Sequence, residues 1–242
     1  MENIDNRLPQ EVIKSNVVEA YKLMNKVISD SRFLNDGYYD PETGYSNQEN
    51  LYFHLVRNLD ISKSRILDVG CGRGGGLNLM YSKLGCLSAA GVDISPDNIA
   101  FCKQTHSSDI DFSVGDAEDL KFDDNSFDIV FNIESAHCYP NFDKFLGEVV
   151  RVLKPGGLFL FTDGVEYESD KNRGRHSLSL MNNFPGIEVV SETDITEMVA
   201  ESCRVDSVSS DYWIVRKISK EKFDKYTTKK SKHLSFVCRK VG

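Results

Sequence analysis

Short runs of apolar residues recur between residues 65 and 162, separated by stretches with helical spacing. Runs of this length, bounded by glycine, proline and acidic residues, are typical of buried strands. Strands are predicted at 65–69, 87–94, 110–114, 127–132, 158–162 and 234–239. Helices are predicted from 75 to about 85, from 96 onward, at 141–153 and at 195–203. Strands that alternate with helices indicate an α/β fold whose mostly parallel sheet is covered by helices on both faces.

Two further helical patterns precede this alternation, at 9–28 and 47–59, with a loop rich in glycine and tyrosine at 34–45 between them. We therefore divide the chain into an N-terminal helical extension over 1–60 and an α/β domain over 61–242. Ligands of such sheets bind beyond the carboxyl ends of the strands, where the strand order reverses. We expect the extension to cover this position as a lid over cofactor and substrate.

Charge and cysteine content narrow the class of protein. The 242 residues carry a formal net charge of −8, and a negative surface repels phosphate backbones, so nucleic acid is not an expected partner. Lysines crowd the segment 217–232, where a solvated helix face is favoured over a patch for anionic ligands. The six cysteines are spaced neither as a zinc site nor as a disulfide framework, and no metal site is expected. With no signal-peptide pattern and no apolar run that could span a bilayer, we expect a cytoplasmic protein.

A glycine-rich segment, Asp68–Gly76, follows the first predicted strand and reads DVGCGRGGG. Gly70, Gly72 and Gly75 match GxGxxG, a pattern that nicotinamide- and flavin-binding proteins use. Glycines at such a turn let the backbone approach a ligand, and the following helix N-terminus adds a positive dipole end. The carboxylate of Asp68 would repel a pyrophosphate but attract an α-ammonium group. S-adenosylmethionine has that ammonium and no phosphate, so it is favoured over NAD.

Two further carboxylates fit the same ligand. Asp93 ends the second predicted strand about 20 residues beyond the glycines, where a carboxylate accepts from both ribose hydroxyls. That distance alone suits NAD equally well. Asp116 ends the third predicted strand and is placed to accept a hydrogen bond from an adenine amino group.

Together these segments resemble the class I S-adenosylmethionine-dependent methyltransferases. The resemblance covers about residues 60–165 and rests on five segments in a fixed order. They are Ile66–Gly74, Val92–Ser95, Gly115–Ala117, Phe127–Val130 and Arg151–Gly157. The resemblance implies a Rossmann-like, doubly wound, seven-stranded sheet and S-adenosylmethionine as cofactor. The linker at 154–157 is interpreted as architectural, because its proline and glycines stop a helix before the fifth strand.

The resemblance also implies which residues hold the cofactor. Asp68 and the glycines would hold its methionine end, Asp93 its ribose, and Asp116 with Ala117 its adenine. The predicted cofactor-binding residues are Tyr38, Asp68, Gly70, Gly72, Gly74, Asp93, Ile94, Asp116, Ala117 and Ile133.

Segments 132–140 and 189–196 resemble a small-molecule branch of these enzymes, the bacterial natural-product O-methyltransferases of the phthiotriolone and phenolphthiotriolone type. This implies O-methylation of a secondary metabolite or lipid-like acceptor. The alternatives are N- or C-methylation of a small molecule or peptide, and a non-catalytic binding protein of the same fold. Methylation of nucleobases is disfavoured, because Asn132–Ser135 lacks the paired prolines of those enzymes. Methylation of protein arginine is disfavoured, because Glu134 and Glu148 are too far apart.

A general base assists methyl transfer to a hydroxyl. His137, a few residues past the fourth predicted strand, is the predicted base, with a packed or solvent-bonded loop histidine as the alternative. His176 is the second choice. Glu134 is a candidate contact for the methionine part of the cofactor or for an acceptor amine. Tyr38 lies in a segment that resembles the loop closing over the cofactor in related enzymes, but it could instead only anchor the N-terminal helices.

Overall fold

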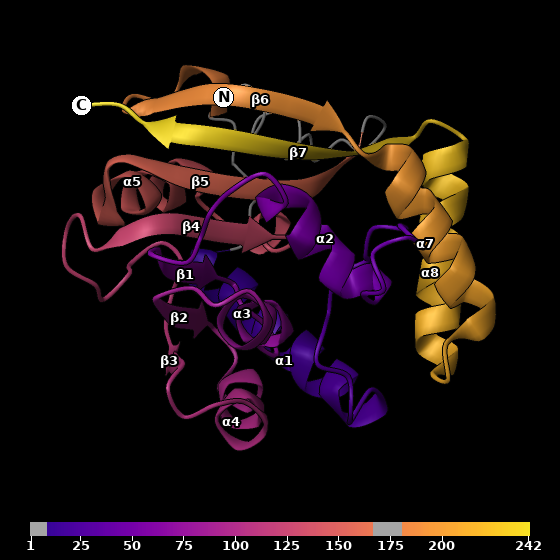
Figure 1. Ribbon diagram of the computed structural model, residues 1–242. Coiled ribbons are helices and arrows are strands. Elements are labelled where there is room, and N and C mark those ends of the chain that lie inside the picture. Colours follow the sequence, from indigo (N-terminus) through magenta and orange to yellow (C-terminus); the bar gives the residue numbers. More distant parts are fainter. Residues whose placement is uncertain (1–8, 167–180) are drawn as a thin grey trace, which may run out of the picture.

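Seven strands lie in one sheet in the part of the chain that the computed structural model describes, residues 9–166 and 181–242 (Figure 1). The strands are β1 Arg65–Val69, β2 Ser88–Asp93, β3 Asp111–Val114, β4 Phe127–Ile133, β5 Leu153–Glu166, β6 Ile187–Asp194 and β7 Ser231–Lys240. The α-helices are α1 Gln10–Val27, α2 Asn47–Val56, α3 Gly75–Asn78, α4 Pro96–Thr105, α5 Phe142–Val152, α7 Thr196–Ser209 and α8 Trp213–Thr227. A π-helical turn, η1 Leu79–Lys83, and a 3₁₀ turn, η2 Ala136–Cys138, complete the set.

The strand order is β3-β2-β1-β4-β5-β7-β6, and β7 runs antiparallel to both of its neighbours. The order reverses between β1 and β4, which pair in parallel. In sheets of this kind the ligand site lies outside the carboxyl ends of the strands at this reversal. The predicted α/β class and the seven-stranded, mostly parallel, Rossmann-like sheet are confirmed.

Apolar side chains pack on both faces of the sheet. Ile66 and Leu67 are adjacent in β1 and completely buried, yet they belong to separate apolar clusters. Successive side chains of a strand point to opposite faces, so both faces of β1 are covered. Residues of α2, α3 and α4 belong to the cluster of Ile66, and those of α5 to the cluster of Leu67. Burying each large apolar side chain contributes about 1.5–3 kcal/mol.

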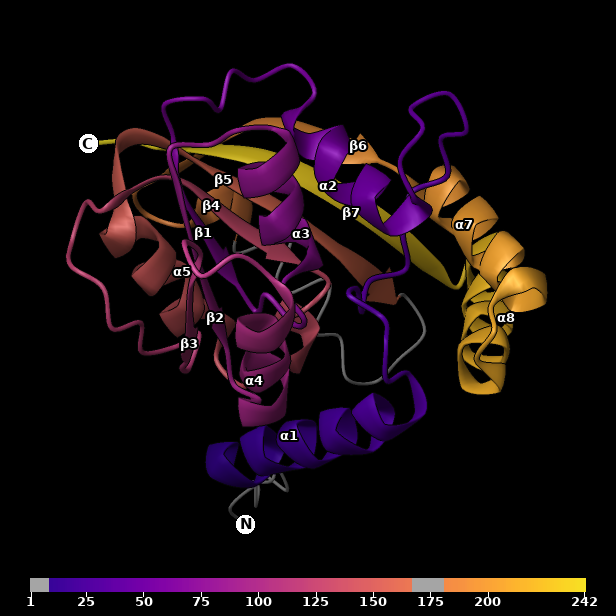
Figure 2. The same cartoon turned by 60° about the horizontal axis from the view of Figure 1, so that its bottom comes forward.

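The two N-terminal helices differ in how they attach. Ser46 and Glu49 form a capping box at the start of α2, whose apolar side is buried against the sheet cluster. In contrast, α1 buries none of its residues (Figure 2). It lies across the end of the domain close to α4 and η2. Half-buried apolar side chains such as Val17 and Tyr21, together with polar contacts such as that of Lys14 with Asp116, therefore hold α1 in place.

Two elements, the helix expected after residue 75 and the strand β5, differ in form or extent from the sequence-based prediction. The helix expected from 75 to about 85 is one α-helical turn followed by the π-helical turn η1. β5 begins at residue 153, directly after α5, so the segment 154–157 lies within the strand rather than ahead of it. A register shift in the pairing of β4 with β5 accommodates this segment, whose Gly156 has φ 76°. A bulge of this kind lets proline and glycine occur inside a strand.

β6 and α8 were not predicted as a strand and a helix. Most side chains of β6 are exposed, so its sequence lacks the apolar run that identified the inner strands. The sequence of α8 is rich in lysine, and these residues obscured the helical spacing of the apolar residues that pack on α7. α7 and α8 form a hairpin between β6 and β7 in the chain. In Figure 1 this hairpin lies beyond the ends of the strands.

Candidate functional site

A cavity of about 840 Å³, open to solvent on one side, lies beyond the carboxyl ends of β1 to β4. Side chains of α1, residues 32–35 and the glycine-rich loop after β1 line it, and the amide of Gly75 in this loop donates to the carbonyl oxygen of Arg32 at 3.1 Å. The segments after β2, β3 and β4 complete the lining. Its place at the reversal of strand order is that of a ligand site in sheets of this kind.

The turn after β1 is tight because its glycines adopt positive φ. Gly70 has φ 76°, and the amides of Gly70 and Cys71 both donate to the carbonyl oxygen of Val92 at 2.8 and 3.0 Å. A Cβ on Gly70 would lie 2.3 Å from the hydroxyl of Ser135. Gly70 and Gly72 line the cavity. Gly74 starts α3 with φ 75° but is not among the described residues that line it.

Asp68 lies below the cavity and is completely buried. Its Oδ2 accepts a hydrogen bond from the hydroxyl of Tyr52 at 3.0 Å, and Tyr52 itself lines the cavity. Its Oδ1 is buried and has no hydrogen-bond partner within the described chain. Burial raises the pKa of Asp68 to about 7, although the hydrogen bond from Tyr52 acts to lower it. A buried carboxylate oxygen without a donor is suited to a ligand ammonium, but direct contact of Asp68 with the cofactor stays a prediction, because it is not among the lining residues.

Asp93 and Ile94 both line the cavity after β2. Oδ2 of Asp93 accepts from the amide of Gly72 at 2.9 Å, and Oδ1 accepts from the amide of Ser95 and the side chain of Asn98. Burial nevertheless raises the pKa of Asp93, against the lowering effect of these hydrogen bonds. The carboxylate is held rigidly and presents its remaining acceptor positions to the cavity.

Asp116 and Ala117 line the cavity after β3. Nζ of Lys14, from α1, lies 2.6 Å from Oδ2 of Asp116 and 2.8 Å from Oε2 of Glu118. The predicted adenine contact therefore also anchors α1.

Arg73 provides a second anchor for the N-terminal extension. Its Nη1 donates to the carbonyl oxygens of Ile28, Ser29 and Ser31, which follow α1. The guanidinium also stacks on the ring of Phe101 at 4.0 Å, where a cation–π contact stabilises it. Sequence analysis selected neither Lys14 nor Arg73 as a site residue, because their partners are distant along the chain.

Ile133 and Tyr38 occupy different surroundings. Ile133, the last residue of β4, lines the cavity. Tyr38 is not one of the lining residues among those described. Its ring stacks on His54 at 4.7 Å, and its amide donates to the carbonyl of Asn47. Its contact with the cofactor stays a prediction, while its packing against α2 is observed.

His137 forms a dyad with Asp163, a residue of β5 that sequence analysis did not select. Nδ1 of His137 lies 2.8 Å from Oδ1 of Asp163, and the His137 amide donates to Oδ2 at 3.0 Å. The charge of Asp163 raises the pKa of His137 well above its usual value, although the side chain of His137 is 52% exposed. The imidazole does not line the cavity, although its neighbours Ser135 and Cys138 do. His176, the second candidate, lies outside the described residues.

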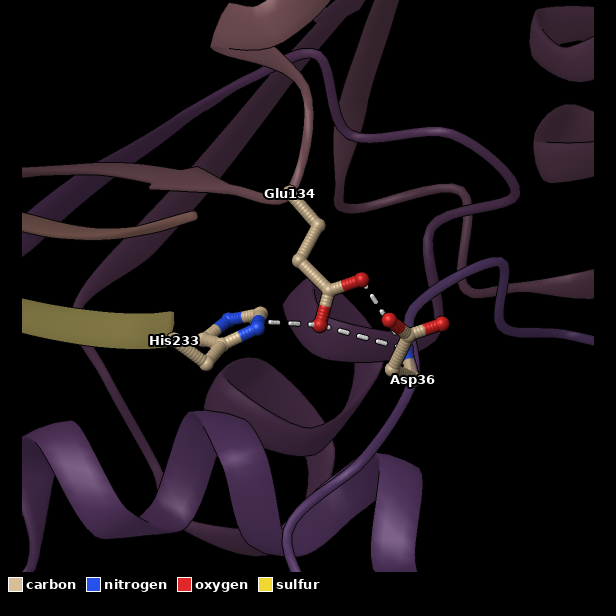
Figure 3. A group of neighbouring side chains, drawn as sticks. All are labelled: Asp36, Glu134 and His233. Carbon is tan, nitrogen blue, oxygen red and sulfur yellow. Dashed lines mark hydrogen bonds and ion pairs between the residues drawn. The ribbon is translucent and has the colours of Figure 1, made fainter. Parts of the chain in front are cut away.

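Asp36, Glu134 and His233 form a buried polar cluster beside the cavity (Figure 3). They come from the loop before α2, the turn after β4 and strand β7. The carboxylate of Glu134, which also lines the cavity, accepts from the amide of Asp36 at 3.0 and 3.2 Å. Nε2 of His233 lies 3.6 Å from Oε1 of Glu134. Glu134 has φ 49°, a left-handed conformation that is rare outside glycine, and strain of this kind tends to occur at functional sites.

Burial shifts the pKa values of Glu134 and His233 in this cluster. Burial and the charge of Asp36 raise the pKa of Glu134 well above its usual value. Burial lowers the pKa of His233 to about 4, so its ring is neutral at pH 7. Nζ of Lys222, from α8, lies 2.5 and 2.7 Å from the two carboxylate oxygens of Asp36. His233 and Lys222 could not be found from the sequence, because neither lies in a motif.

Comparison with known proteins agrees with this geometry. Residues 67–161 match the family described as "Methyltransferase domain". A probable phthiotriol/phenolphthiotriol dimycocerosates methyltransferase of Mycobacterium ulcerans (strain Agy99) is 49% identical over 115 residues, 47% of this chain and 45% of the relative. A fatty-acid O-methyltransferase of Mycolicibacterium smegmatis is 43% identical over 142 residues, 54% of this chain and 52% of the relative. The matches thus span about half the length of these curated relatives.

Solved structures show the same fold. Geranyl diphosphate C-methyltransferase from Streptomyces coelicolor A3(2) aligns with a TM-score of 0.77 at 17% identity, over 97% of this chain and 100% of that one. The [4+2]-cyclase SpnF aligns with a TM-score of 0.71 at 22% identity, over 100% of both chains. At such identities the likeness establishes the fold alone.

Residues 67–161 therefore resemble a methyltransferase domain. About half of the chain is similar to methyltransferases named for phthiotriol dimycocerosates and for fatty acids. Among the described residues, no helix is both long enough and apolar enough to cross a bilayer.

Proposed function

We propose that this protein transfers a methyl group from S-adenosylmethionine to an oxygen of a small, lipid-like acceptor. The observation that carries the proposal is the convergence of the glycine turn, Asp93 and Asp116 on one cavity at the reversal of strand order. The names of the two curated relatives support a lipid-like acceptor, since one is named for phthiotriol and phenolphthiotriol dimycocerosates and the other for fatty acids.

The residues of the cavity fit this cofactor group by group. Asp93 is held by three donors and is ready to accept from the ribose hydroxyls. Asp116 and Ala117 are the expected adenine contacts, and Asp68 attracts the α-ammonium group through its unpartnered oxygen. When bound, S-adenosylmethionine supplies an electrophilic methyl group on a positively charged sulfur. The protein contributes mainly position and the exclusion of water, and Phe33 and Leu34 extend the apolar part of the cavity wall.

The His137–Asp163 dyad is the proposed base for a hydroxyl acceptor. Asp163 fixes Nδ1 and leaves Nε2 to accept the proton that the hydroxyl loses. A fatty acid, in contrast, is already ionised at neutral pH and needs no base. Removing His137 therefore distinguishes the two acceptor types.

We propose that the extension over residues 1–60 acts as a lid on the α/β domain at 61–242. Lys14 and Arg73 hold α1 and the residues that follow it by ion pairs and hydrogen bonds, so this part of the extension can open while α2 stays packed on the sheet cluster. An opening lid would admit both cofactor and acceptor to the cavity.

The test is a reaction of the full chain with S-adenosylmethionine and two acceptor sets, fatty acids and long-chain lipids with hydroxyl groups. Mass spectrometry should detect a product heavier by one CH₂ in one of the sets. Asp93→Ala should abolish product at limiting cofactor, while the control Asp97→Ala, at an exposed position of α4, should not. Cofactor binding without product from either set would refute the lipid-like acceptor. A failure to bind cofactor would refute the whole proposal.

A further inference from the structure

We infer that Asp36, Glu134 and His233 form a binding site for one divalent metal ion beside the cofactor cavity (Figure 3). Each residue offers one ligand atom, and these atoms all lie within 4.8 Å of one another. Ligands bound to one ion at about 2.0–2.2 Å lie roughly 3–4.4 Å apart, so small side-chain movements would complete the coordination. The sequence had predicted no metal site, because its three ligands are separated by about 100 residues each.

His233 is the strongest ligand. Its side chain is only 1% exposed, and its Nε2 has no hydrogen-bond partner among the described residues. Figure 3 shows this nitrogen directed at Glu134. On the other side of the ring, Nδ1 lies 3.1 Å from the hydroxyl of Tyr226. If Nδ1 donates to Tyr226, Nε2 carries a free lone pair, which is how an outer partner typically orients a metal-binding histidine.

The two carboxylates are also held in place. Glu134 is 6% exposed and is turned toward the cluster by its left-handed backbone. Asp36 is 12% exposed and is tied to Glu134 through its own amide and to Ser202 through its carbonyl. One imidazole and two carboxylates suit first-row divalent ions such as Mn²⁺ or Zn²⁺.

Lys222 determines how strongly the site attracts a cation. Its ammonium contacts both oxygens of Asp36, so it neutralises one of the two carboxylates. A metal ion would compete with this ammonium for Asp36, and the two positive charges would repel each other. Removing the ammonium should therefore strengthen metal binding, a result that a merely structural cluster would not give.

The position of the ion would give it a part in the reaction. Glu134 lines the cavity, so an ion bound to it would lie at the cavity wall. There it could bind an acceptor oxygen and lower the pKa of its hydroxyl, as Lewis-acidic ions do. This consequence rests on the proposed methyl transfer, whereas metal binding itself does not.

Metal binding can be measured on the full chain without cofactor or acceptor. After treatment with EDTA and removal of the chelator, the protein is dialysed against Mn²⁺, and free Mn²⁺ is counted by its electron paramagnetic resonance signal. We expect one Mn²⁺ per chain, at least tenfold weaker binding in His233→Ala and Glu134→Gln, and tighter binding in Lys222→Met. His54→Ala is the matched control: this half-buried histidine also has one unpartnered nitrogen but belongs to no cluster of ligands in the described chain, and its loss should leave binding unchanged.

A second measurement covers variants that fail to fold. Saturating Mn²⁺ should raise the thermal midpoint of the unmodified protein, because an ion that binds only the folded state stabilises it. No stoichiometric Mn²⁺ and no rise in the midpoint would overturn the site. So would binding that persists unchanged in folded His233→Ala and Glu134→Gln. A protein that binds Mn²⁺ but yields no methylated product would leave the metal site standing and refute only the proposed function.

Discussion

The hydroxyl of Tyr52 donates to Oδ2 of Asp68 at 3.0 Å, while Oδ1 of the same carboxylate is buried and has no hydrogen-bond partner in residues 9–166 and 181–242. An ionised carboxylate in this environment is costly unless a cation approaches it. The α-ammonium group of S-adenosylmethionine is such a cation. The proposed role of Asp68 is therefore one of charge as well as shape.

The affinity for S-adenosylmethionine should depend on pH through Asp68. The pKa of Asp68 is raised to about 7, so its carboxyl group ionises as pH rises through neutrality, and only the ionised form attracts the ammonium. We expect affinity to increase several-fold between about pH 6 and pH 7.5. Asp68→Asn should weaken binding by about 1–3 kcal/mol at pH 7.5 and reduce this increase. Titration calorimetry at several pH values checks both, and an unchanged pH dependence in the variant would remove Asp68 from the account.

The His137–Asp163 dyad predicts a second pH effect, in turnover. A base must be neutral to accept a proton, and Asp163 raises the pKa of His137 above its usual value. With a hydroxyl acceptor, kcat should therefore rise with pH through this elevated pKa. In Asp163→Asn the rise in kcat should occur at lower pH, because the negative charge that raises the pKa of His137 is gone. Cys138, which also raises the pKa of His137, stays in place in that variant. If kcat rises at the same pH in both proteins, His137 is not the titrating base.

Gly70→Ala tests whether the turn after β1 requires a glycine, and Gly85→Ala is the matched control. Both have positive φ, 76° and 72°, but a Cβ on Gly70 would lie 2.3 Å from Ser135, whereas one on Gly85 meets no atom within 4 Å. Each alanine costs about 1–2 kcal/mol for its left-handed backbone. Gly70→Ala should cost roughly 1–3 kcal/mol more through overpacking and should abolish cofactor binding. Equal losses in urea-induced unfolding of both variants would contradict the steric account of this turn.

Lys14 tests the attachment of α1 over the cavity. Lys14→Met removes the contacts with Asp116 and Glu118, so the lid should open more often and bound cofactor should dissociate several-fold faster. Lys22→Met, on the same helix, removes only an exposed pair with Glu19 and should not change the rate. Stopped-flow displacement of a fluorescent cofactor analogue measures the rate. Equal rates in the two variants would indicate that α1 is not held through Lys14.

Much of the fold could be predicted because the inner strands are buried on both faces and appear as apolar runs. Ile66 and Leu67 illustrate this, since each serves a different face. β6 was missed because its outward positions are polar and exposed. The wall residues Asp93, Asp116 and Ile133 were also predictable, because they end strands that meet at one edge.

The remaining site residues depend on contacts between distant segments. Asp163 lies in β5, the neighbour of the strand β4 that precedes His137, but it is 26 residues away from His137 in the chain, and nothing in its local sequence marks it. His233 meets Glu134 only because β7 inserts beside β5. Such pairings follow from topology, which no local pattern of residues specifies.

The most direct test of the central claim is a calorimetric titration of the full chain with S-adenosylhomocysteine and, separately, with NAD. The account predicts micromolar binding of S-adenosylhomocysteine at one site per chain and no binding of NAD, because a buried carboxylate at the end of β1 favours an ammonium over a pyrophosphate. Binding of NAD, or of neither ligand, would contradict it.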